Sequence, residues 1–358
     1  MYASLGFETL TAPQAAVWLG ALLGLAFGAA AAVSRFCLRR GLVAGPERRA
    51  ALAVWAAGLA VAVLGTQAAV AAGLVEFGAH RFHAAELPML AVLLGGTLFG
   101  AGMVLTRGCP SRLLVLGAGG NLRALAVILV FALVAHATLK GLLAPARVAL
   151  GGVTMPLGDV AALGALPGDG LAWAALLAAG ALALAWRAGA RPRDLALGAL
   201  IGALVPAGWV GTGLVLFDDF DPVALESLSF TAPAADSLFF AIASTAVPAT
   251  FGVGLLAGTL AGALVAAVLR REARWESFES PRQTGRYALG AVLMGVGGVL
   301  AGGCTVGAGL SGVATLGVSA LLALAAIVAG ARATDALLTR GGAGSAAPSA
   351  TRRALPAE

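Results

Sequence analysis

Apolar stretches of about twenty residues, long enough to span a bilayer as helices, recur along almost the whole of this 358-residue chain. Hydrophobic residues make up 60% of the chain and charged residues only 11%. The mean hydropathy is +0.94, which is far above the range of soluble domains. The sequence therefore predicts an all-α polytopic membrane protein.

About nine transmembrane helices are expected, together with re-entrant half-helices. Three short segments, 110–121, 305–317 and 234–246, are too short to cross a membrane and are interpreted as the half-helices. Residues 1–340 are predicted to form a single membrane domain. Residues 341–358 are rich in Gly, Ser, Ala and Pro, which predicts a disordered cytoplasmic tail. The predicted spans are 15–33, 51–75, 88–106, 124–143, 169–187, 195–216, 248–269, 287–302 and 318–338.

Basic residues are concentrated in alternate loops between these spans. One set of loops receives twenty arginines, whereas the other set receives only Arg81, Lys140 and Arg147. Because cytoplasmic loops carry the excess of Lys and Arg, the N-terminus is predicted outside and the C-terminus inside the cell. The net charge of +6 is attributed to this orientation, so no nucleic-acid partner is expected.

Two segments, 95–109 and 290–304, resemble each other, and each ends in Gly-Cys. They lie in the third and the eighth predicted spans, and this odd offset gives the two copies opposite orientations. The sequence therefore predicts two inverted pseudo-repeats, at approximately 15–143 and 195–338. Inverted repeats with broken helices are a recurrent plan of transporters, in which the substrate site lies where the repeats meet.

The chain has three cysteines, Cys37, Cys109 and Cys304, and each lies where a predicted span breaks. An isolated cysteine in a membrane helix is usually a small packing residue, but three at helix breaks favour a functional role. An iron–sulfur cluster would need four thiolates. Met and His are too scarce for a soft-metal site. Neither a metal nor a cofactor is therefore expected.

Thiols are weak donors and polarisable acceptors, and can pass along a soft anion that carries sulfur. Nearby arginines would attract such an anion, and half-helices that begin after Gly108 and Gly303 would offer backbone N–H groups to it. The residues predicted to line this path are Cys37, Cys109, Cys304, Arg35, Arg107, Arg112, Gly108, Gly303, Thr305, Ser111 and Ser311.

Three motifs resemble the YeeE/YedE family of sulfur transporters: 34–37 (SRFC), 107–112 (RGCPSR) with 119–123 (GGNLR), and 303–312 (GCTVGAGLSG). The resemblance covers about residues 15 to 335. It implies thiosulfate uptake across a bacterial inner membrane, with the N-terminus in the periplasm and the cysteines marking the path through hydrogen bonds to the ion. It also implies cooperation with a small cytoplasmic TusA-like sulfur carrier, which this chain does not contain.

One departure from the family pattern leaves the substrate open. The segment 110–112 (PSR) follows the second cysteine, where the thiosulfate importers tend to have a smaller residue and glycine, so another sulfur or selenium oxyanion is an alternative.

The alternatives from other classes are a membrane-embedded sulfurtransferase that forms a cysteine persulfide, and a structural subunit whose cysteines only pack. The chain lacks a Walker loop, which argues against ATP as the driving force, and it is not expected to be an enzyme. Membrane lipids are expected partners. Among lesser features, His80 and His83 are predicted to lie in a solvated outer loop, and His136 to form an interhelical hydrogen bond.

Overall fold

The computed structural model describes residues 10–218 and 220–342, which are almost entirely helical. Two π-helical turns, η5 (Gly211–Val215) and η6 (Gly307–Gly312), extend or follow long helices, and η2 (Arg81–His83), η3 (Gly158–Ala161) and η4 (Leu163–Ala165) are 3-10 turns. The α-helices are α1 (Ala12–Ser34), α2 (Leu38–Leu42), α3 (Arg48–Ala71), α4 (Met89–Leu105), α5 (Pro110–Ala118), α6 (Leu122–Lys140), α7 (Ala144–Gly151), α8 (Asp169–Ala188), α9 (Pro192–Val210), α10 (Ala232–Ala243), α11 (Phe251–Leu269), α12 (Pro281–Leu300) and α13 (Val318–Gly342).

Among the described residues, eight helical segments are long and apolar enough to span a membrane. In this set, α1 continues into α2, α4 into α5, and α9 into η5. The prediction of an all-α polytopic membrane protein is thus confirmed.

The eighth predicted span, 287–302, is helical as far as Leu300 but is not among these eight segments. It belongs to α12, whose first turns carry Arg282 and Arg286. The apolar part of α12 therefore begins only at Tyr287, and it is shorter than the roughly 17 residues that a full crossing needs.

Two further predictions concern short segments and the tail. The predicted half-helix 305–317 contains a short helical segment whose turns at Gly307–Gly312 are π-helical (η6). Residues 341–342 end α13, and the rest of the predicted tail, 343–358, lies outside the described residues.

Side-chain caps fix the beginnings of several helices. The Thr11 hydroxyl accepts a hydrogen bond from the Gln14 N–H, and the Gln14 side-chain oxygen accepts one from the Thr11 N–H. These two bonds form a capping box at the start of α1. The Asn121 side chain caps α6 through the Ala124 N–H at 2.9 Å. Ser280 caps α12 in the same way.

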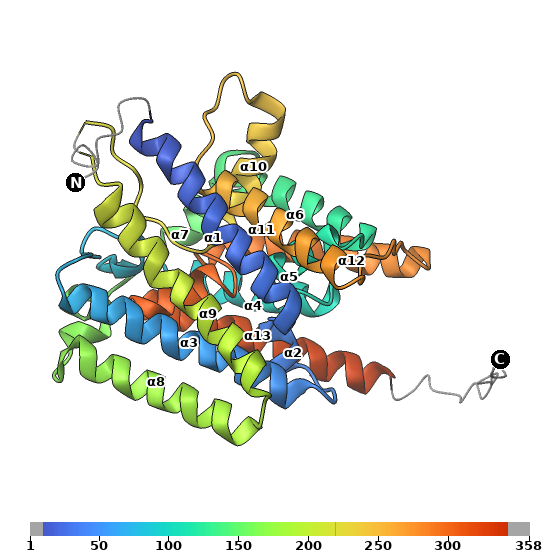
Figure 1. Cartoon of the computed structure of the whole chain (residues 1–358), viewed down its shortest axis with the longest axis horizontal. Helices are drawn as coiled ribbons and strands as arrows, with labels where there is room; N and C mark the ends of the chain where they lie inside the picture. The colour runs from blue at the N-terminus through green and yellow to red at the C-terminus, as the bar shows by residue number, and fades with distance from the viewer. Residues whose placement is uncertain (1–9, 219, 343–358) are drawn as a thin grey trace.

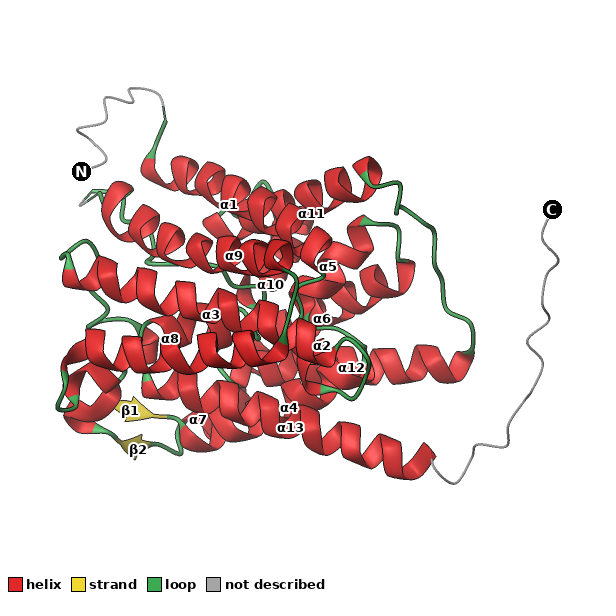
Figure 2. Ribbon diagram, turned by 60° about the horizontal axis from the view of Figure 1, so that its bottom comes forward, coloured by secondary structure: helices red, strands yellow, loops and turns green. Residues whose placement is uncertain are grey.

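The long helices lie side by side with similar axis directions, as Figure 2 shows. One end of the bundle carries a small antiparallel ribbon of β1 (Glu86–Leu87) and β2 (Met155–Pro156), in which Leu87 pairs with Met155. We call it the ribbon end. The opposite end, where α1 and α4 finish and α9 and α12 begin, carries most of the arginines, and we call it the arginine end.

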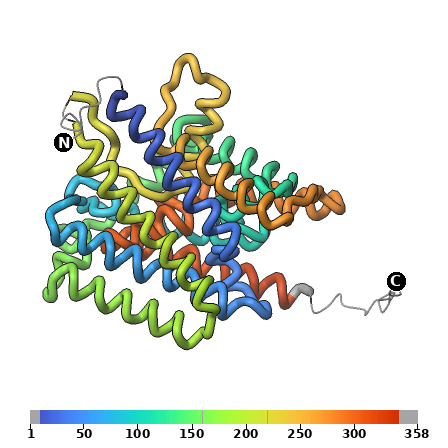
Figure 3. Tube along the Cα trace, in the orientation of Figure 1, coloured from blue at the N-terminus to red at the C-terminus, as the bar shows by residue number. Residues whose placement is uncertain are grey.

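Helices distant in the sequence pack in matching pairs (Figures 1 and 3). Helix α1 lies along α11, as α9 lies along α3. Helix α4 packs against α13, as α12 packs against α6, and α4 and α12 also pack against each other. Helices from the N-terminal half and the C-terminal half of the chain thus pack against each other in one bundle.

Glycines allow these helices to approach each other at backbone distance. A Cβ atom on Gly24 of α1 would lie 2.2 Å from the Leu255 carbonyl oxygen, and one on Gly258 of α11 would lie 2.0 Å from that of Ala21. A Cβ on Gly202 of α9 would lie 2.2 Å from the oxygen of Gly58 in α3. Such small-residue contacts replace the hydrophobic effect as the source of helix association in a membrane.

The pairing predicts opposite effects of the same substitution at two glycines. In a helix, Gly→Ala normally stabilises by about 1 kcal/mol. Gly180→Ala in α8 should follow this rule, because nothing lies within 4 Å of the added Cβ. Gly258→Ala should instead lower the thermal unfolding midpoint of the purified protein, because its Cβ has no space. An equal or higher midpoint for Gly258→Ala would contradict this packing.

Candidate functional site

The first break in the bundle lies between α4 and α5. Helix α4 ends at Leu105, Arg107 adopts a left-handed conformation with φ of 61°, and Pro110 begins α5 directly after Cys109. The Thr106 hydroxyl lies within hydrogen-bond distance of two backbone oxygens, at 2.9 Å from that of Gly102 and 3.0 Å from that of Gly108. The hydroxyl thereby gives a hydrogen-bond partner to backbone carbonyl groups at the break, which a membrane interior without water requires.

The second break follows α12. The backbone turns at Gly302, where φ is 74°, and Cys304 comes two residues later. The Cys304 sulfur accepts a hydrogen bond from the Gly307 N–H at 3.3 Å, and its carbonyl accepts from Ala308 and Gly309. This wide turn leads into η6, and π-helical turns of this kind are frequent at functional sites.

The third cysteine follows α1. This helix ends at Ser34, Arg35 is left-handed with φ of 53°, and Cys37 immediately precedes α2. All three cysteines therefore lie between two helical segments, as the sequence predicts. All are free thiols, and their exposed fractions are 2% for Cys37, 2% for Cys109 and 0% for Cys304.

Two of the thiols lie together. Cys37 and Cys109 are within hydrogen-bonding reach of each other, and the charge of Arg112 acts on both thiols. The Cys109 sulfur also lies 3.2 Å from the Ser111 hydroxyl. The fully buried Thr305 hydroxyl faces Cys109 and has no hydrogen bond of good geometry. Thr305 thus connects the group formed by Cys37, Cys109 and Ser111 with its sequence neighbour Cys304.

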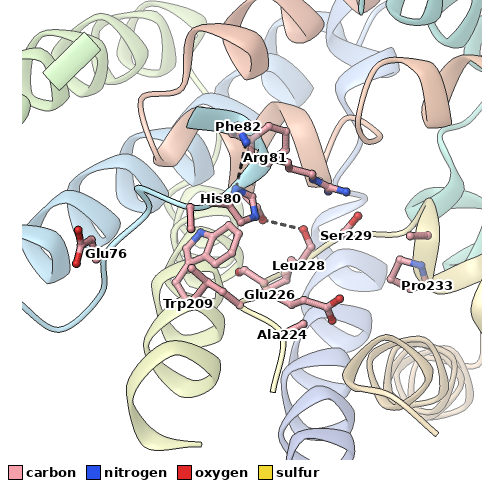
Figure 4. Close-up of a pocket in the computed structure, with 16 residues that line it drawn as sticks. Glu76, His80, Arg81, Phe82, Trp209, Ala224, Glu226, Leu228, Ser229 and Pro233 are labelled. Carbon is pink, nitrogen blue, oxygen red and sulfur yellow. Dashed lines mark hydrogen bonds between the residues drawn. The ribbon is translucent and has the colours of Figure 1, made fainter. Parts of the chain in front are cut away.

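A cavity of about 370 Å³ opens at the ribbon end, beyond Cys304 (Figure 4). We call it the Arg81 cavity. It reaches Gly307 and Ser311 of η6, and Gly307 is the residue that donates its N–H to the Cys304 sulfur. The side chains that define it are His80, Arg81, Trp209, Glu226, Ser229 and Ser311.

Arg81 connects this cavity with the second break. It also borders a small cavity of about 30 Å³ next to Gly302 and Gly303, and its charge interacts with Cys304. No ion pair of Arg81 is found among the described residues. Arg81 was missed as a site residue by sequence reasoning, since in the sequence it is one of three scattered basic residues on the outer side.

The predicted solvated loop around His80 and His83 is instead packed against the protein. Burial lowers the pKa of His80 to about 4, so its ring is neutral at physiological pH. His83 Nε2 lies 2.9 Å from the Thr315 carbonyl oxygen. Phe82 is buried against η6, where its ring lies 2.9 Å from the Cβ position of Gly312. This packing holds Arg81 in place between the two histidines.

At the arginine end, a cavity of about 470 Å³ lies beside Ser34 and Arg35, close to Cys37 in the chain. Glu47 forms ion pairs there with Arg35, at 3.7 Å, and with Arg40. The cavity is also lined by Arg191, Arg193, Asp194 and Arg270. Arginines outnumber the acids, which makes this end attractive to an anion.

Not every predicted path residue joins this set. Arg107 lines a separate cavity of about 330 Å³ with Arg282 and Arg286, away from the thiols. His136 stacks on Phe239, with ring centres 4.8 Å apart, and its Nδ1 has no hydrogen-bond partner. No cluster of His, Cys, Asp and Glu that could hold a metal occurs among the described residues.

Comparison with known proteins gives one family and two relatives. The family model described as "Sulphur transport" matches residues 26–333. The chain is 25% identical to a protein named thiosulfate transporter TsuA from Spirochaeta thermophila, over 86% of this chain and 94% of that protein. It is 40% identical to the Escherichia coli protein of the same name over 83 residues, a match that spans 23% of this chain and only 23% of that protein.

The two threonines near the breaks predict contrasting effects on stability. Thr305→Val removes a buried hydroxyl that lacks a good partner, so the thermal unfolding midpoint should stay the same or rise. Thr106→Val leaves the Gly108 carbonyl oxygen without its hydroxyl partner and should destabilise by about 1–3 kcal/mol. Thermal unfolding of both variants in detergent measures this, and a lower midpoint for Thr305→Val would contradict the contacts described.

Proposed function

Because the chain belongs to the Sulphur transport family, we propose that it imports thiosulfate, or a closely related sulfur anion, along a path lined by its three cysteine thiols. The observation that carries the proposal is the position of Cys109. Its thiol lies at a helix break and interacts with both the Cys37 thiol and the Thr305 hydroxyl next to Cys304. The names of the two relatives support thiosulfate as the substrate.

The anion enters at the ribbon end and leaves at the arginine end. Arg81 attracts it into the Arg81 cavity, and the Cys304 thiol with the Gly307 N–H receives it there. It then passes Thr305 and Cys109 to Cys37. Arg112 supplies positive charge to this part of the path, since its charge acts on both inner thiols. Weak thiol donors hold a dianion loosely, which permits it to move on.

This route fits a protein of a bacterial inner membrane with the ribbon end in the periplasm and the arginine end in the cytoplasm. The arginine distribution supports that orientation. The matching helix pairs, α1 with α11 and α9 with α3, support two inverted pseudo-repeats whose broken helices meet at the path. A TusA-like cytoplasmic carrier would receive the sulfur at the arginine end.

Loss of a thiol at the breaks should stop uptake. Cys109→Ala and Cys304→Ala should each reduce uptake of ³⁵S-thiosulfate into proteoliposomes at least about tenfold, because alanine keeps the packing but removes the S–H group. Cys→Ser restores a donor that is less polarisable and should rescue uptake only in part. Thr305→Val should lower uptake without loss of stability.

Equal amounts of folded protein, checked by thermal unfolding, are the control for these variants. Unchanged uptake by both alanine variants would show that the cysteines only pack. A persulfide mass on a cysteine after turnover, without intact thiosulfate inside, would instead indicate the sulfurtransferase. Competition by sulfite, sulfate or selenite measures whether another oxyanion is preferred.

The orientation has its own test. Single cysteines introduced by Asp221→Cys, in the segment after η5, and by Arg274→Cys, after α11, should label on opposite faces of the membrane. A membrane-impermeant maleimide should label the first in intact cells and the second only after permeabilisation. The unsubstituted chain is the control, since its thiols are buried. Labelling of both positions from one side would contradict the proposed topology.

A further inference from the structure

The Arg81 cavity contains a carboxylate at a place where an anion has to pass. Glu226 lines the cavity together with Arg81, and both side chains open into it (Figure 4). They do not form an ion pair, because no contact between them within 4 Å occurs among the described salt bridges. An ionised Glu226 would repel a dianion that approaches Arg81. The cavity therefore binds such an anion less well while that carboxylate is charged.

Glu226 cannot easily move out of the way, because its backbone is fixed at both polar atoms. Its N–H donates to the Thr212 hydroxyl at 3.1 Å, and the same hydroxyl lies 2.8 Å from its carbonyl oxygen. Thr212 belongs to η5 at the end of α9, so the segment that carries Glu226 is tied to a membrane-spanning helix. Only the carboxylate remains free to respond to the contents of the cavity.

The surroundings of Glu226 favour its neutral form. Removal from water raises the pKa of the Glu226 carboxyl above its ordinary range, and the charge of Asp236 in α10 raises it further. Arg81 opposes both effects. From the loop before α4, His80 is neutral and contributes no charge, and Glu76 lies at the far side of the cavity from Arg81 (Figure 4). Arg81 is therefore the cation that favours the ionised carboxylate while the cavity is empty.

We propose that Glu226 is a proton-linked gate for anion capture: its carboxylate binds one proton from the outer solution as a dianion occupies Arg81, and releases that proton when the anion leaves. The inference rests on the proposed function, because it takes the Arg81 cavity as the entrance of the path. No other bond is made or broken, since the step is a single protonation of one carboxylate oxygen.

The sign of the pH dependence follows from linkage. The anion competes with Glu226 for Arg81 and adds negative charge, so its binding favours the protonated carboxyl. By reciprocity, protonation strengthens anion binding. Affinity should therefore rise as pH falls, by up to about tenfold per pH unit while Glu226 is mostly ionised, and should level off once it is protonated.

Calorimetry on the purified full-length protein tests this directly. Titration with sodium thiosulfate in two buffers of different ionisation enthalpy gives the number of protons taken up with each anion. Wild type should take up close to one proton per anion at neutral pH. E226Q, which mimics the neutral carboxyl, should bind thiosulfate with no proton uptake and with an affinity that is the same from about pH 5 to about pH 8.

E76Q is the matched control, because Glu76 lines the same cavity but lies far from Arg81 (Figure 4). It should behave as wild type. A carboxylic-acid C=O infrared band that appears with thiosulfate in wild type and is absent in E226Q would identify the protonated group.

Two results would overturn the inference while the proposed function stands: thiosulfate binding to wild type without proton uptake, or an unchanged pH dependence in E226Q. A failure of wild type, E226Q and E76Q alike to bind thiosulfate at any pH would overturn the proposed function and the inference together.

Discussion

A helix that ends away from water must find partners for its free backbone groups, and this requirement organises the structure. Thr106, directly after α4, and Ala301, directly after α12, are both buried. At the first break the Thr106 hydroxyl approaches two carbonyl oxygens. At the second, the carbonyl and the sulfur of Cys304 accept N–H groups from η6. A thiol stands at each break: the Cys304 sulfur accepts the Gly307 N–H, and the Cys109 sulfur lies beside the Ser111 hydroxyl.

The two helices that precede these breaks, α4 and α12, touch each other at glycines. A Cβ on Gly95 would lie 2.8 Å from the Gly297 carbonyl oxygen, and one on Gly102 would lie 2.5 Å from that of Gly290. These four glycines belong to the two similar sequence segments, so the resemblance of the segments corresponds to a physical contact between them. The partners run in opposite order along the two helices, so α4 and α12 pack antiparallel. Thr305, after the end of α12, nevertheless faces Cys109, after the end of α4.

Local features of the fold could be predicted from the sequence, because hydropathy and glycine placement act over short distances. The span positions and the location of Cys109 at a break are of this kind. Long-range pairings could not be predicted. Nothing local indicates that Cys37 meets Cys109, that Arg81 reaches the break before Cys304, or that Arg107 faces Arg282 instead of a thiol. Helix α12 is an intermediate case, because its two arginines were visible in the sequence but its start at Pro281 was not predicted.

The central claim is that one anion path contacts all three thiols. Protection of the cysteines from alkylation tests it most directly: the purified protein is treated with iodoacetamide, with or without thiosulfate, and each cysteine peptide is quantified by mass spectrometry over time. The account predicts that thiosulfate slows alkylation of Cys37, Cys109 and Cys304 together, and that an equal concentration of chloride does not. Alkylation rates that thiosulfate leaves unchanged at all three cysteines would contradict it.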